Sequence, residues 1–296
     1  MITGREISGN MSIDKLKIAG VVILYHPGKD LTGNINSYLY FIDHLFVIDN
    51  SENRNLSMLD TVINSEKVSY HFNDSNLGIA SALNLGIERA LSAGYSYILT
   101  MDQDSSFEDD SLEKLISVIS NDISIGIYSP IHKNKFLTNP PQSNTREEVS
   151  DVMTSGNILN LSVVNKIGKF ADEYFIDYVD IEYCLRLRKN GYKILRINNS
   201  ILNHNEANLS RRVFFGKTVY PPNHSALRWY YKIRNFHYLM QEYSNDFPEY
   251  FIVEKKNMTN NILKVLIFEK NKIDKVKMMI KGYMDYRKKI TGRMPD

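Results

Sequence analysis

Short apolar runs alternate with helical repeats through the first two thirds of the chain, and this alternation restricts the possible folds more than any other feature. The runs are rich in β-branched residues and bounded by turn formers, which is typical of buried strands. Strands are predicted at residues 18–25, 44–50, 67–72, 95–102 and 123–130, and helices at 78–94 and 109–120. The pattern predicts an α/β fold, a mostly parallel central sheet flanked by helices.

The pattern changes after residue 130. We expect a loop at 131–148 rich in Pro, Asn, Ser and Lys, then a short strand at 149–153, a turn at 154–157, a helix at 180–191 and a strand at 192–197. From about residue 223 the pattern is helical to the end. We therefore expect an α/β domain over residues 12–210 and a C-terminal helical extension over residues 211–296.

The charge is nearly balanced but unevenly placed. The 36 Lys and Arg against 34 Asp and Glu give a formal net charge of +2, which argues against a general nucleic-acid binder. Residues 251–296 alone hold twelve basic and five acidic residues, a basic tail on a slightly acidic body. Within this tail, residues 259–290 predict one amphipathic, lysine-rich helix. Such a helix lies on an anionic membrane surface. The alternative is that it packs on protein, either on the rest of this chain or on a second subunit of a homodimer.

The cysteine content and the apolar runs indicate the cellular compartment of the protein. The single cysteine, Cys184, cannot form an intrachain disulfide, so the fold does not depend on oxidation. No apolar run approaches the roughly 18 residues that span a bilayer, and the first ten residues contain no apolar signal region. These features predict a cytoplasmic protein, with peripheral contact at the inner face of the cell membrane if the tail binds lipid.

Two aspartates lie at the end of the fourth predicted strand. Asp102 and Asp104 are two residues apart, so in an extended segment both carboxylates point the same way. They would stand at the carboxyl edge of the sheet, where open α/β folds bind ligands. Two hard oxygen donors suit Mg²⁺ or Mn²⁺ bridging to a substrate diphosphate. The alternative is that Asp104 or Ser105 only caps a helix. His204, beyond a later strand, is a candidate third ligand or a structural histidine.

Other polar residues follow strands or begin helices. Asp49 ends the second predicted strand, and Asn76 opens the long helix, whose N-terminal amides favour an anion. Arg228, Tyr231 and Arg234 lie within two helical turns and are candidates for binding a substrate diphosphate. Both guanidinium groups suit the geometry of diphosphate oxygens. The alternative is an aromatic helix face packed on the core. Neither the glycine-rich dinucleotide fingerprint nor the P-loop is present.

Three carboxylates cluster at the start of the helix at 180–191. Asp177, Asp180 and Glu182 cannot all cap the helix, so a general base is expected among them. The alternative is a solvated acidic helix start that pairs with Arg186 or Arg188.

In this order the segments resemble the inverting family 2 glycosyltransferases with the GT-A fold, over roughly residues 17–237. The segments that carry the resemblance are VVILYHPG, VIDNSEN, NLGIASALNLGIERA, MDQDSS, FIDYVDIEYCLR and SALRWYYKIRN. Within the family the chain is most similar to bacterial rhamnosyltransferases that use dTDP-L-rhamnose. The resemblance implies that L-rhamnose is moved to a glycan or lipid-linked acceptor in cell-surface glycan synthesis. The alternatives are a UDP-sugar donor, such as UDP-galactofuranose, or a noncatalytic scaffold.

The resemblance also implies roles for single residues. Asp49 would contact the nucleoside, Asp102 and Asp104 would occupy the family's D-x-D positions, and His204 would complete the metal site. Asp180 falls on the position of the catalytic base. The family expects a Glu directly before it, where this chain has a valine, so Asp177 stays as the alternative base.

Overall fold

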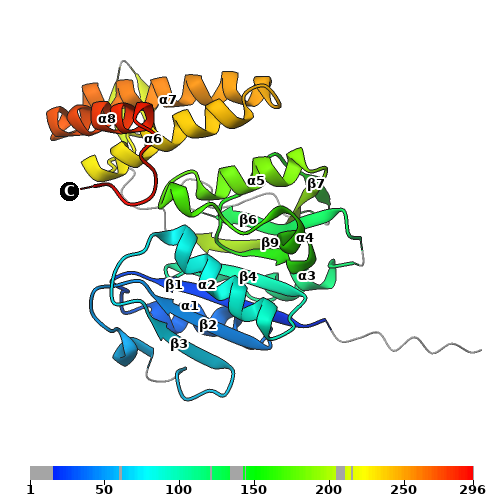
Figure 1. Ribbon diagram of the computed structural model, residues 1–296. Helices are drawn as coiled ribbons and strands as arrows, with labels where there is room; N and C mark the ends of the chain where they lie inside the picture. Colours follow the sequence, from blue (N-terminus) through cyan, green and yellow to red (C-terminus); the bar gives the residue numbers. More distant parts are fainter. Residues whose placement is uncertain are drawn as a thin grey trace, which may run out of the picture.

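The computed structural model describes residues 16–59, 62–120, 122–133, 143, 145–204, 211–214 and 216–295. Figure 1 shows a central sheet with helices on both faces and three C-terminal helices grouped beside it. The strands of the main sheet are β1 (Ile18–Leu24), β2 (His44–Asp49), β3 (Val68–Phe72), β4 (Tyr97–Asp102), β5 (Ser105–Phe107), β6 (Ile125–Lys133), β7 (Arg146–Glu148), β8 (Asn157–Asn160) and β9 (Lys193–His204). A separate hairpin is formed by β10 (Arg212–Phe214) and β11 (Lys217–Val219).

The helices alternate with these strands. They are α1 (Leu31–Leu39), α2 (Ile79–Ser92), α3 (Ser111–Ser117), α4 (Leu161–Ile167), α5 (Val179–Lys189), α6 (Ala226–Tyr243), α7 (Pro248–Phe268) and α8 (Lys272–Arg287), with short 3-10 turns η1 (Leu56–Leu59) and η2 (Asp172–Tyr174).

The strand order places one edge of the sheet at a topological switch point. The order is β3-β2-β1-β4-β8-β6-β9-β5, with β7 also paired to β9. The pairings make β1, β2, β3, β4, β6 and β9 run in one direction and β5, β7 and β8 in the other. The chain leaves β1 toward β3 on one side and returns to β4 on the other. A crevice therefore forms at the carboxyl ends of β1 and β4.

Alternate residues of β1 enter two different cores, as the period of a strand buried on both faces requires. Ala19, Val21 and Ile23 face the cluster that includes α2, α4 and α5 and continues into α6 and α7. Val22 and Leu24 face the second cluster, which is covered by α1 and α3. The first core thus joins the sheet to the C-terminal helices.

The α/β prediction is confirmed. The five strands predicted before residue 131, the start of the strand predicted at 192–197 and the helices at α2, α3 and α5 occur close to their expected bounds. The strand predicted at 149–153 is wrong. Val149 and Val152 pack against the core from an irregular segment, and the strands lie on either side, at β7 and β8. Much of the predicted loop at 131–148 and both ends of the predicted domain at 12–210 lie outside the described residues.

The single helix predicted at 259–290 is in fact the end of α7 and the whole of α8. Asn271 breaks the helix with a left-handed conformation, φ 53°. Helix α8 packs closely on α6 at Gly282. A Cβ added to this glycine would lie 2.4 Å from the carbonyl oxygen of Tyr230, so only glycine fits there. Lys275, predicted on the polar face, is buried and pairs with Glu269 at 2.6 Å. Part of the basic tail therefore packs on the rest of the chain.

No helix described here combines the length and the apolar character needed to cross a membrane.

Candidate active site

A cavity of about 840 Å³ opens at the carboxyl edge of the sheet. Its wall is built from the ends of β1, β4 and β9, the starts of α2 and α5, and one side each of α6 and α7. The predicted residues that line it are Asn76, Asp102, Asp104, Asp177, Asp180, His204 and Arg228. Asp49, Tyr231 and Arg234 do not line it.

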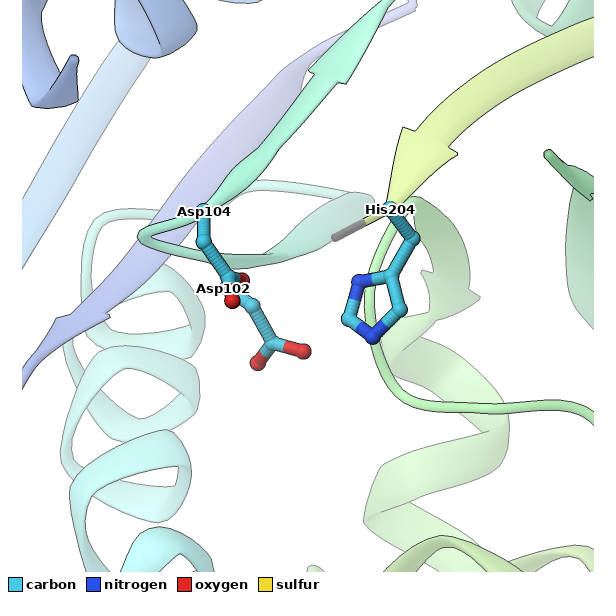
Figure 2. Close-up of side chains that lie close together, drawn as sticks. All are labelled: Asp102, Asp104 and His204. Carbon is cyan, nitrogen blue, oxygen red and sulfur yellow. The ribbon is translucent and has the colours of Figure 1, made fainter. Parts of the chain in front are cut away.

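Three of these side chains form a candidate metal centre. The ligand atoms of Asp102, Asp104 and His204 lie within 4.8 Å of one another. Figure 2 shows the two carboxylates and the imidazole turned toward one space, with the aspartates coming from the end of β4 and the histidine from the end of β9. The short β5 pairs antiparallel with β9 and sets Ser105 opposite His204, which fixes this approach.

The surroundings of these ligands suit a cation. Ser105 Oγ lies 2.8 Å from His204 Nδ1, and in the tautomer whose Nδ1–H donates to this hydroxyl, Nε2 presents its lone pair. Burial raises the pKa of Asp102 to about 6, and the charge of Asp104 adds to the rise. Two carboxylates this close repel each other, so a divalent ion between them is strongly favoured.

Asp180 is positioned by an unusual helix start. The preceding residues Phe175, Asp177 and Tyr178 all have positive φ, between 62° and 67°. Gly78, with φ 88°, meets this loop so closely that a Cβ would lie 2.7 Å from the Phe175 carbonyl oxygen. Asp180 is half-buried at the first turn of α5. Burial raises its pKa to about 6, although backbone amides at the helix start lower it in part. A carboxylate with this pKa is basic enough to accept a proton at neutral pH.

Asp177 does not share this environment. Its carboxylate takes two hydrogen bonds from the Arg228 guanidinium, at 2.5 and 3.1 Å, and an ion pair from Lys232 at 3.0 Å. Burial alone would raise the pKa of Asp177, but Lys232 and Arg228 outweigh it and lower the pKa. A carboxylate neutralised in this way is a poor proton acceptor. Asp177 therefore holds the two cations, and Asp180 is the carboxylate of the two whose pKa is raised.

Glu182, the third carboxylate of the predicted cluster, faces away from the cavity. It pairs with Arg186 at 2.8 Å and accepts a hydrogen bond from Tyr243 at 2.8 Å. Of the alternative that the sequence left open, the pairing with Arg186 is found for this residue, but Glu182 is buried and not solvated.

Arg234 and Tyr231 lie behind the site rather than in it. Arg234 is fully buried and donates to the carbonyl oxygens of Glu173, Tyr174 and Gly292. Its guanidinium also lies over the Tyr231 ring, 5.0 Å from the centroid. Tyr231 stacks on Phe175 and accepts the backbone N–H of Met294. These contacts leave no place for a diphosphate and hold the loop before α5 instead.

Asp49 is also enclosed. Tyr70 donates its hydroxyl to the Asp49 carboxylate at 2.5 Å, and the backbone N–H groups of Ser51 and Asn55 donate to it as well. The next residue, Asn50, lines the cavity and donates to Asn76 Oδ1 at 3.1 Å. Asp49 therefore shapes the turn that presents Asn50 and Asn76 to the cavity.

Several lining residues were missed by the sequence reasoning. Lys232 follows Arg228 by one helical turn, so helical spacing could have identified it as a second cation. His224 precedes α6, and burial together with the charges of Lys232 and Arg228 lowers its pKa to about 3, so it is neutral. Glu254 and Asn261 come from α7, and no local signal marks them as cavity residues.

Comparison with known proteins identifies the family. The model of glycosyl transferase family 2 matches residues 22–176, just over half of the chain. The chain belongs to this family. The prediction from the sequence motifs is thus confirmed, and the matched segment contains the Asp102 and Asp104 positions of this glycosyltransferase.

Individual relatives agree with this assignment. The glycosyltransferase is similar to the dTDP-rhamnosyl transferase RfbF of Shigella flexneri, at 28% identity over 93% of this chain and 97% of the relative. Among solved structures it resembles GalNAc-T7 with UDP, GalNAc and Mn²⁺, at 12% identity and a TM-score of 0.59, over 93% of this chain and 56% of that one. It also resembles S. aureus TarS 1–349 in complex with UDP-GlcNAc, at 15% identity and a TM-score of 0.52, over 92% and 72%. The structural likeness confirms the GT-A fold.

The assignment of the base is tested by Asp180→Asn, which preserves size and removes the proton acceptor. We expect kcat to fall by at least about a hundredfold, the usual scale for a lost general base. In the unmodified protein kcat should fall as the pH drops through about 6, because the protonated carboxyl cannot accept a proton. Steady-state kinetics between pH 5 and pH 9, about the range that brackets this pKa, would show both effects.

The matched variant is Asp177→Asn, which should weaken donor binding by releasing Arg228 and Lys232. If it instead reproduces the loss of kcat and the acid limb while Asp180→Asn remains active, the base is Asp177.

Proposed function

We propose that this glycosyltransferase moves L-rhamnose from dTDP-L-rhamnose to a hydroxyl group of a glycan or lipid-linked acceptor, with inversion at the anomeric carbon. One observation carries the proposal: a single cavity holds the carboxylate and imidazole cluster at the sheet edge, two cations on α6, and the half-buried Asp180. The named relative, a dTDP-rhamnosyl transferase, supports the choice of donor. We assign the metal ligands and the base to the domain at residues 12–210, and the extension at 211–296 adds Arg228 and Lys232 to the same cavity.

Mg²⁺ or Mn²⁺ fits the three residues that would hold it. Asp102 and Asp104 supply hard oxygen donors and His204 supplies a nitrogen. When bound, the ion would neutralise the diphosphate as its negative charge grows. The Mn²⁺ in the GalNAc-T7 structure supports a divalent cation in a protein of this fold.

The chain's own residues provide the remaining chemistry. Arg228 and Lys232 place two positive charges in the cavity beside Asp177, where they would stabilise the departing diphosphate. Asp180 would take the proton from the acceptor hydroxyl as that oxygen attacks the anomeric carbon. Attack and departure on opposite faces of the sugar make one displacement, so no covalent intermediate is required.

The donor sugar is the finer part of the proposal. Rhamnose presents a methyl group where hexoses carry a hydroxymethyl, so its pocket should be apolar at that point. Met153, Val179 and Ile181 contribute apolar surface to the same cavity as Asp180. This wall supports a deoxysugar donor, with UDP-sugars as the alternative within the same fold.

A donor panel tests the proposal directly. Purified protein is incubated with dTDP-L-rhamnose, UDP-rhamnose, UDP-glucose, UDP-N-acetylglucosamine and UDP-galactofuranose, and sugar release or transfer is followed by mass spectrometry. We expect dTDP-L-rhamnose to be turned over at least about tenfold faster than any UDP-hexose. EDTA should abolish turnover, and Mn²⁺ or Mg²⁺ should restore it.

Exclusive use of a UDP-hexose would overturn the donor assignment, and full activity in EDTA would overturn the metal site. No turnover of any nucleotide sugar would favour the noncatalytic scaffold.

We also propose that α7 lies on an anionic membrane surface, where a lipid-linked acceptor would be presented. The helix buries Phe251, Met258 and Val265 on one side. Its opposite side exposes the apolar side chains of Ile252, Val253, Leu263, Leu266 and Ile267. Lys255 and Lys256 are exposed beside them, and each basic residue adds about 1 kcal/mol to the free energy of binding to an anionic surface. An apolar stripe with basic neighbours fits a charged lipid surface better than bulk water.

Vesicle flotation tests this contact. The triple variant Ile252→Asp, Leu263→Asp, Ile267→Asp should stay at the bottom of the gradient, whereas the unmodified protein should float with phosphatidylglycerol-containing vesicles. Tyr40→Asp changes an exposed aromatic residue directly after α1; this variant serves as the control and should float. Equal flotation of the triple variant would reject the membrane contact. A change from dimer to monomer without any flotation would assign the stripe to a second subunit.

A further inference from the structure

The inner side of α7 forms one wall of the cavity. Glu254, Met258 and Asn261 all line it, and their spacing of four and three residues places them on one face of the helix. This face lies on the side of α7 opposite to the exposed apolar stripe. The family model ends at residue 176, so this wall lies outside the matched segment.

The wall is tied to the helix that carries Asp180. Tyr178, the residue at the start of α5, donates its hydroxyl to Glu254 Oε1 at 2.9 Å. Burial and the charge of Glu254 raise the pKa of Tyr178 well above its usual value, so the phenol keeps this proton. Glu254 thus stands at a fixed place beside the base, held by a residue two positions before it.

We propose that Glu254 and Asn261 form the acceptor subsite, which binds the hydroxyl groups of a neutral saccharide. This rests on the proposed function. In a single displacement the acceptor oxygen approaches the anomeric carbon from the face opposite to the diphosphate. The metal cluster, Arg228 and Lys232 mark the diphosphate side. The acceptor therefore occupies the part of the cavity next to Asp180 that these groups leave free. Helix α7 lines the same cavity and is tied to the start of α5 through the hydrogen bond from Tyr178 to Glu254.

The chemistry of the wall selects the class of acceptor. A carboxylate accepts hydrogen bonds from sugar hydroxyl groups, and each Glu254 oxygen retains a free lone pair beyond the bonds from Tyr178 and Asn257. Asn261 accepts from Lys264 at 3.2 Å, and its amide NH₂ has no partner among the described residues, so it can donate to a sugar oxygen. Met258 gives an apolar patch between them. Asp180 and Glu254 place two carboxylates at this end of the cavity, which repel a carboxylate or a phosphate on the acceptor sugar, while the ammonium of Lys264 is engaged by Asn261 Oδ1.

Kinetics with synthetic acceptors tests the subsite. The probes are octyl α-L-rhamnoside, octyl β-D-glucoside, octyl N-acetyl-β-D-glucosaminide and the anionic octyl β-D-glucuronide, each with the donor that the panel selects. We expect transfer to at least one neutral glycoside and at least tenfold lower kcat/KM with the glucuronide than with the glucoside. Glu254→Gln should reduce this discrimination to less than threefold.

The variants Glu254→Ala and Asn261→Ala should each raise the KM for the neutral acceptor about tenfold and leave the KM for the donor within twofold. Asn260→Ala is the matched control, because Asn260 is exposed on the same helix and does not line the cavity; its acceptor KM should not change.

The result has distinct readings. If no nucleotide sugar is hydrolysed or transferred, the proposed function fails. If the donor is hydrolysed but no neutral glycoside is glycosylated, or if acceptor KM is unchanged in both alanine variants, the subsite is wrong. Equal use of the glucuronide and the glucoside would overturn its selectivity for neutral saccharides.

Discussion

The active site depends on two side chains of α6 that bind the backbone of the loop before α5. Asn235 Nδ2 lies 2.8 to 2.9 Å from the carbonyl oxygens of Tyr174, Ile176 and Asp177, and Arg234 donates to those of Glu173 and Tyr174. The loop enters the left-handed region repeatedly, so neither helix nor sheet partners can satisfy these carbonyl groups. A buried carbonyl without a donor is strongly destabilising. The amide and the guanidinium donate to these groups together with the backbone N–H groups of Ile176 and Gly292, and thereby hold the loop from which α5 begins.

From this loop the placement of charge follows. Asp177 is held where it meets Arg228 and Lys232, and Asp180 begins the helix one turn further on. Two carboxylates three residues apart therefore have opposite environments. One is neutralised by cations and has a lowered pKa, and the other is desolvated and has a pKa of about 6. Separating carboxylates in this way lets one organise positive charge while its neighbour accepts a proton.

Much of the fold could be predicted from the sequence because its signals are local. Buried strands such as β1 show as unbroken apolar runs, and Asp102 and Asp104 are noticeable because they follow such a run directly. Arg234 could not be placed in the same way. An arginine among aromatic residues looks equally suited to an anion and to a cage of carbonyl oxygens, and only the path of residues 173–177 decides between them. The α7 wall was missed for the same reason, because Glu254 reaches the cavity only through the packing of distant helices.

We infer that Asp180, Arg228 and Lys232 together catalyse a single displacement at the anomeric carbon. The most direct test is the anomeric configuration of the product, read by NMR from the one-bond carbon–hydrogen coupling at the anomeric carbon when dTDP-β-L-rhamnose is the donor. We expect an α-L-rhamnoside as the only product, because one displacement inverts the anomeric carbon. A β-L-rhamnoside would show that the configuration is retained. A single attack assisted by Asp180 cannot give retention, so this product would contradict the single displacement.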